Sequence, residues 1–183
     1  MLTSLAQVIP AVVPRVAPNY FAHTFGLLKP DLVAATPRAA AVVRALAAPD
    51  SPLRIVALSH REVDPQLADA FYADHAGKFF APRLTASICS GPLVAMVLES
   101  VPASGEHAAG SIDVSAIEAW RSLIGPTKVN SARCALPGTL RGLYSTSDTR
   151  NAFHGADAHA AVLAEAELFF PGLLAAAPRP ARE

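Results

Sequence analysis

The sequence has little charge and no long hydrophobic run. Charged residues make up 16% of the 183 residues, and 15 Lys and Arg balance 15 Asp and Glu, so the formal net charge is zero. A neutral chain gives no electrostatic argument for nucleic acid as an obligatory partner. No run of about 18 apolar residues occurs, which argues against a membrane span. We therefore expect a soluble globular protein whose anion-binding residues are placed locally.

Cysteine is also scarce. Cys89 and Cys134 are too few for a disulfide scaffold and share no metal-like spacing, so we expect free thiols and a reducing compartment. The hydrophobic fraction of 52% is enough for one domain with a sizeable core.

Acidic residues are absent from the first thirty positions. An acid-poor start is typical of mitochondrial transit peptides, but prolines at 10, 14 and 18 prevent a continuous helix. Residues 1–20 are therefore either an extended surface arm or a targeting segment. The location stays open between mitochondrial and cytoplasmic, with weak support for the first.

Strands and helices alternate along the remaining chain. Periodicity and helix-start signals predict strands at 21–30, 53–63, 91–100 and 142–147, and helices at 36–48, 64–75, 79–90, 114–125 and 156–170. The continuously apolar strand 91–100 suits the centre of a sheet, and 21–30 is expected to be half-buried. Residues 126–140 show no periodicity and are predicted to be a long loop. Segments this short favour an α+β, ferredoxin-like βαββαβ sandwich, an antiparallel sheet with helices packed on it.

These elements predict one domain at 21–172. It is interrupted by an insertion loop at about 101–115, whose residues are small and polar and show no helix or strand periodicity. Residues 173–183 are expected to be a frayed tail.

His154 has an unusual setting. It is expected just before the last helix, with Asp157 as N-cap, Gly155 leaving room for a large ligand, and Glu165 eleven residues on. If that helix packs beside His154, Glu165 can accept from Nδ1–H and leave Nε2 as a nucleophile. Histidine nucleophiles most naturally take phosphoryl groups.

Phosphoryl transfer also needs cations around the phosphate oxygens. The sequence offers Lys29, Arg121 and Arg141, and Thr127 could donate a hydroxyl group. An isolated Lys or Arg is usually a solvated surface residue, so none of these is informative alone.

Six separated segments, taken together, resemble the signature segments of nucleoside diphosphate kinases. In order, they are TFGLLKPDLV, FYADHAGKFF, SGPLVAMVLE, WRSLIGPT, PGTLRG and RNAFHGAD. The match covers about residues 22–170, and N-x-x-H-G is similar to the family's phosphohistidine signature. The longer loop at 127–137 and the stretches GPTKV and SDTRN resemble the divergent type 6 (group II) branch found in eukaryotes.

The resemblance implies a nucleoside diphosphate kinase-like fold and a ping-pong transfer of the γ-phosphate of a nucleoside triphosphate to a nucleoside diphosphate, as in CTP, GTP and UTP biosynthesis. It implies that Nδ1 of His154 is phosphorylated while Glu165 faces Nε2, the reverse of the assignment made above from the residues alone. Mg²⁺ is expected to bridge the nucleotide phosphates with no direct protein ligand.

The resemblance also implies individual roles. Lys29, Arg121 and Thr127 match phosphate-binding residues, and Arg141 matches an arginine at the transferred phosphate. The remaining matches are a tyrosine near the lysine and histidine, a base-stacking aromatic, a ligand of the sugar 3′-hydroxyl and the partner of the histidine: Tyr72, Phe80, Asn151 and Glu165. Stacking on a ring tolerates many bases, because every base has a π-face.

Four departures from the family pattern point to reduced activity and put a hexamer in doubt, although a homo-oligomer stays possible. They are Ala156 in place of the usual serine, about three extra residues in 127–137, the 101–115 insertion and a short C-terminus. Two alternatives remain open. One is a nucleotide-binding regulatory subunit with weak or partner-dependent kinase activity, and the other is a protein-histidine phosphocarrier.

Overall fold

The computed structural model describes residues 22–101 and 115–174. The strands are β1 (His23–Leu28), β2 (Leu53–Arg61), β3 (Leu93–Ser100) and β4 (Phe153–Gly155). The helical elements are α1 (Pro30–Val33), α2 (Thr36–Leu46), α3 (Pro65–Phe71), the 3₁₀ turn η2 (Ala73–His75), α4 (Ala81–Ile88), α5 (Ala116–Ile124), α6 (Val129–Ala135), α7 (Leu140–Tyr144) and α8 (His159–Phe169). The predicted arm lies outside the described residues, as do most of the insertion loop and the tail, and the proposed domain limits stay predictions.

The sheet is antiparallel, with strand order β2-β3-β1-β4. Helices α1 and α2 connect β1 to β2, α3 and α4 lie between β2 and β3, and α5, α6 and α7 lie between β3 and β4. This is the predicted ferredoxin-like βαββαβ order, with a helical hairpin, α3 to α4, added in the middle. The apolar strand β3 is an inner strand, as its sequence predicts.

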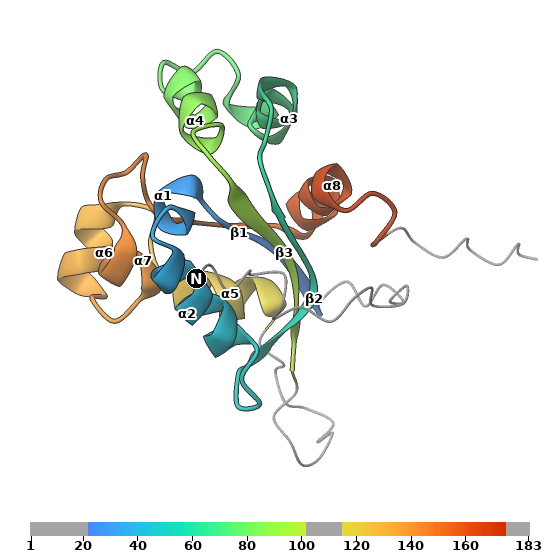
Figure 1. Cartoon of the computed structure of the whole chain (residues 1–183), viewed down its shortest axis with the longest axis vertical. Helices are drawn as coiled ribbons and strands as arrows, with labels where there is room; N and C mark the ends of the chain where they lie inside the picture. Colours follow the sequence, from blue (N-terminus) through green and yellow to red (C-terminus); the bar gives the residue numbers. More distant parts are fainter. Residues whose placement is uncertain (1–21, 102–114, 175–183) are drawn as a thin grey trace, which may run out of the picture.

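Helices cover both faces of the sheet (Figure 1). Along β3, Val94, Met96 and Leu98 face the core with α2 and α5, and the alternating residues face the core with α3 and α8. Every residue of β1 is consequently buried. The expectation of a half-buried strand at 21–30 is therefore wrong.

Three helix ends follow the signals in the sequence. Asp64 caps α3 by accepting from the Leu67 N–H, ahead of Pro65. Ser115 forms a capping box with Glu118 at the start of α5. Gly125 ends α5 with φ 79°, a conformation that glycine adopts without a Cβ clash.

Three local predictions are wrong. The first half of the predicted strand 142–147 is the end of helix α7, and the second half is not a strand. The N-terminus of α7 is capped by Thr139 Oγ1 accepting from Gly142 N–H. The predicted loop 126–140 contains α6, whose first N–H, on Val129, donates to Asp148. Asp157 does not cap the last helix, because α8 begins at His159 and its N-cap is Ala158, which has an extended conformation.

Candidate active site

His154 lies in the middle of β4, paired with Leu27 of β1. The sequence predicts that His154 lies just before a helix, but in the structure it lies in a strand. The His154 carbonyl accepts from Trp120 Nε1 at 2.9 Å. A Cβ at Gly155 would lie 2.7 Å from the Trp120 ring, so glycine is required for the indole to reach the strand. The pairing of β4 with β1 and the hydrogen bond from the Trp120 indole together fix the backbone of His154.

The His154 ring contacts Glu165 of α8, with Nε2 2.7 Å from Oε2. A carboxylate only accepts, so Nε2–H is the donor and Nδ1 is the ring nitrogen that does not face the carboxylate. The assignment from residues alone, with Glu165 on Nδ1, is wrong. The geometry agrees with the arrangement that the resemblance implies. Phe71 packs edge-on against the imidazole, with centroids 4.9 Å apart.

Lys29 follows β1 directly, and its Nζ donates to Asn151 Oδ1 at 2.8 Å. Both side chains are buried. Burial lowers the pKa of Lys29 to about 8, with nearby Arg141 acting in the same direction and Asp31 against it. An ammonium with little water around it interacts strongly with any anion that arrives.

Two arginines hydrogen-bond to the residues that flank His154 in β4. The guanidinium of Arg141 is buried and donates to Gly125 O at 2.6 Å and Phe153 O at 3.0 Å. Burial and the neighbouring Arg121 lower the pKa of Arg141 to about 10. Arg121 donates to Gly155 O at 3.3 Å. Three cations, predicted separately, therefore contact the chain on both sides of His154.

An aromatic row connects His154 to Phe80. From Phe71 it continues to Tyr72 at 4.9 Å, to His75 at 6.0 Å and to Phe80 at 5.6 Å between centroids. Tyr72 has its pKa raised by burial and by the charge of Glu165. The row therefore joins both aromatic residues of the predicted site.

Thr127 is the predicted residue that the structure does not bring into this group. It is exposed, two residues beyond Gly125, and within the described ranges no hydrogen bond connects it to the cations. Phe71, Trp120 and Asp31 were not predicted and contact the site. Trp120 could have been found from its place next to Arg121, as the one tryptophan in the chain.

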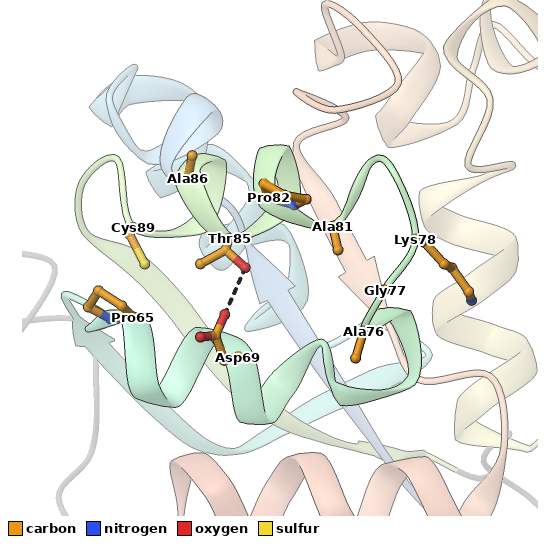
Figure 2. Close-up of a pocket in the computed structure, with 10 residues that line it drawn as sticks. All are labelled: Pro65, Asp69, Ala76, Gly77, Lys78, Ala81, Pro82, Thr85, Ala86 and Cys89. Carbon is orange, nitrogen blue, oxygen red and sulfur yellow. Dashed lines mark hydrogen bonds between the residues drawn. The ribbon is translucent and has the colours of Figure 1, made fainter.

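A separate hollow of about 700 Å³ lies between α3 and α4. Figure 2 shows the hydrogen bond between Asp69 and Thr85 that spans it, with Cys89 near one end and Lys78 at the other. None of the predicted site residues lines it. It is therefore distinct from the residues around His154.

Within residues 22–101 and 115–174, no group of three or more His, Cys, Asp or Glu side chains could hold a metal ion. The cations that hydrogen-bond to the chain near His154, Lys29, Arg121 and Arg141, are donors suited to phosphate. Such residues fit Mg²⁺ that arrives with the nucleotide and is held by phosphate oxygens. No helix in the described part of the chain is long and apolar enough to cross a membrane.

Comparison with known proteins shows the family to which the chain is similar. The family model described as nucleoside diphosphate kinase matches residues 22–173. Nucleoside diphosphate kinase 6 of Xenopus tropicalis is 35% identical over 150 residues, covering 81% of this chain and 74% of the relative. A probable nucleoside diphosphate kinase of Dictyostelium discoideum is 34% identical over 158 residues, covering 85% and 96%. The solved nucleoside diphosphate kinase of Aquifex aeolicus superposes with a TM-score of 0.67 at 30% identity, covering 83% of this chain and 96% of that one.

The chain therefore belongs to the nucleoside diphosphate kinase family, a class of phosphotransferases that bind nucleotides. Within the family it resembles the divergent type 6 branch, since relatives of that name from frog and human are 35% and 34% identical.

Proposed function

We propose that this protein is an active nucleoside diphosphate kinase that works through a phosphohistidine at His154. The observation that carries the proposal is the contact between His154 Nε2 and Glu165 at 2.7 Å, which orients Nδ1 as the free nucleophile. The buried cations Lys29 and Arg141, which hydrogen-bond to Asn151 and Phe153 just before His154, support it.

In the first half-reaction, the Nδ1 lone pair attacks the γ-phosphorus of a nucleoside triphosphate. The N–P bond forms as the bond from phosphorus to the bridging oxygen of the β-phosphate breaks, and the nucleoside diphosphate leaves. The imidazole becomes cationic, and the Glu165 carboxylate stabilises it through Nε2–H. In the second half-reaction, a terminal oxygen of another nucleoside diphosphate attacks the same phosphorus and the N–P bond breaks.

The chain's own cations stabilise the charge on the transferred phosphoryl group. Lys29 and Arg141 are held by hydrogen bonds before substrate arrives, so they need little reorganisation during transfer. Mg²⁺ bound with the nucleotide would neutralise phosphate charge. In this proposal Asn151 contacts the sugar, and Phe80, at the end of the aromatic row, stacks on the base.

The test is to incubate purified protein with γ-labelled ATP and Mg²⁺, quench it, and look for acid-labile label on the chain. We expect label that moves onto added GDP and is absent from His154→Ala, which should still bind nucleotide. Loss of the nucleophile should reduce turnover by at least about 10³-fold.

Absence of label despite nucleotide binding would contradict the proposal. It would favour the regulatory subunit, whose transfer activity should then appear when a partner protein is added. Label that moves to a protein and never to GDP would favour the phosphocarrier.

A further inference from the structure

The turn before β4 is fastened to the end of β1 by three hydrogen bonds. The Ala152 N–H donates to Asp31 Oδ2 at 3.0 Å, and the Ala152 carbonyl accepts from the Lys29 N–H at 2.8 Å. The third bond is the one from Lys29 Nζ to Asn151 Oδ1. Residues 29–31 and 151–152, far apart in sequence, therefore form one closed unit two residues before His154.

Ala152 has φ 64°, and among the described residues it is the one non-glycine with positive φ. This left-handed conformation is unfavourable for alanine and persists where its surroundings impose it. Three hydrogen bonds impose it here: those to the Ala152 carbonyl and from the Ala152 N–H, and one from the Phe153 N–H to the Asn151 carbonyl at 2.7 Å, which closes a tight turn around Ala152. Asp31 supplies the one that comes from a side chain.

Asp31 also bears on the Lys29 ammonium. Its negative charge opposes the effect of burial on Lys29, and Lys29 in turn opposes the rise that burial causes in the pKa of Asp31. The other charged groups facing this pair are Arg141, which acts on Lys29, and Arg150, which acts on Asp31.

We infer that Asp31 is a positioning residue, which fixes the turn ahead of the nucleophile and, through that turn, the place of the Lys29 ammonium that is bonded to Asn151. It touches neither substrate nor the reacting atoms in this assignment. Its catalytic consequence rests on the proposed kinase function, whereas its effect on Lys29 does not. A purely structural role is the competing explanation, because Asp31 lies in the first turn of α1, where acidic residues stabilise a helix.

The test is a titration of Lys29 by NMR in protein carrying ¹³C-labelled lysine. The chain has three lysines, Lys29, Lys78 and Lys128, so the three signals can be assigned with single Lys→Arg variants. In the wild type we expect a Lys29 midpoint of about 8. Asp31→Asn should lower it by roughly one pH unit, the low end for loss of a nearby opposite charge. Asp50→Asn removes an exposed carboxylate from another turn and should leave it unchanged.

The kinetic counterpart is the pH profile of kcat/KM. Asp31→Asn should reduce kcat/KM about tenfold at pH 7 and move the alkaline limb to lower pH. Adding Ala152→Gly should restore part of the rate, because glycine adopts positive φ without the alanine's cost. The double variant should still have its alkaline limb at lower pH than the wild type.

A Lys29 midpoint that is the same in Asp31→Asn and wild type would overturn the inference. If Asp31→Asn does not fold, the same titration is made in Asp31→Asn/Ala152→Gly against Ala152→Gly alone. The proposed function fails separately. Wild-type protein that shows the Lys29 shift but forms no phosphohistidine contradicts the kinase and leaves the positioning role of Asp31 intact.

Discussion

The surroundings of His154 and those of Phe80 are built in different ways. Near the histidine, Lys29, Asn151 and Arg141 are buried, and each hydrogen-bonds to an atom that is itself held in the fold. Phosphoryl transfer depends on aligned charge, and fixed cations provide it without reorganisation.

Near Phe80 the contacts are looser. Phe79 is 86% exposed, and Lys78 is also exposed while it lies 3.1 Å from His75 Nδ1 and 5.9 Å from the Phe80 centroid. Ring faces and an exposed cation can accommodate bases of different shape. If the proposed kinase function holds, we therefore expect a site that is strict about the phosphate and permissive about the base.

Among the variants that test this contrast, replacing a buried cation should reduce kcat/KM the most. Lys29→Met keeps the length of the side chain and removes its charge, so kcat/KM should fall by about 10²–10³-fold. Steady-state transfer from ATP to GDP measures it. Lys78→Met removes an exposed lysine at the base end and should change kcat/KM by less than about threefold. Equal losses in the two variants would show that the ends do not differ.

The same lysine sets a pH dependence. Its pKa of about 8 lies below the usual 10.5, so the charged form needed for phosphate is lost as pH rises through about 8. The profile of kcat/KM, which reports the free enzyme, should therefore decline above pH 8. Between pH 8 and 10.5 the unfolded chain holds this proton and the folded one does not, so Lys29 makes the free energy of unfolding increase with pH. A flat alkaline limb up to pH 10 would contradict the assignment.

Glu165→Gln should have the next largest effect. The amide can still contact Nε2 but cannot balance the charge that the ring gains, so we expect a 10- to 100-fold fall in the rate of phosphohistidine formation. Rapid-quench labelling measures this step directly. The control is Glu167→Gln, an exposed acid on the same helix. A rate unchanged in Glu165→Gln would limit Glu165 to packing.

Ala156→Ser restores the hydroxyl usual in the family. Ala156 is 1% exposed and lies one residue beyond the strand of the nucleophile. One added hydrogen bond of about 0.5–1.5 kcal/mol, if felt in the transition state, raises the rate by up to about tenfold. Rapid-quench labelling again measures it. A slower enzyme would show that the buried site has no room or partner for the hydroxyl.

Phe80→Leu should have the smallest effect. Leucine keeps the apolar contact and loses the π-face, so KM should rise about two- to fivefold for all nucleoside diphosphates, with kcat little changed. Phe79→Leu is the matched control, because Phe79 is the neighbouring residue and its ring is largely in solvent. A rise for one base alone would mean that the base end is selective.

Much of the fold can be predicted because its signals are local. The apolar run of β3, the cap at Asp64 and the glycine that ends α5 are each encoded in a few adjacent residues. Strand β4 cannot be read in this way, since three residues have no periodicity and depend on pairing with β1. Helix α6 likewise depends on a distant partner, Asp148, at its first turn.

The same distinction between local signals and long-range contacts applies to the candidate active site. Its residues can be named from family motifs, and their roles stay predictions until measured. The choice of ring nitrogen facing Glu165 could not come from the residues alone, because it depends on a side-chain rotamer and on how α8 packs. Asp31 was missed because its partner, the Ala152 peptide, lies 121 positions away.

Trp120 gives the protein a built-in optical signal. It is the chain's single tryptophan, and its indole N–H is bonded to the carbonyl of the very residue that would carry the phosphate. A phosphoryl group arriving on His154 changes the electric field at the indole, and its emission should change with it. Stopped-flow fluorescence of the unlabelled protein should then record each half-reaction as it happens.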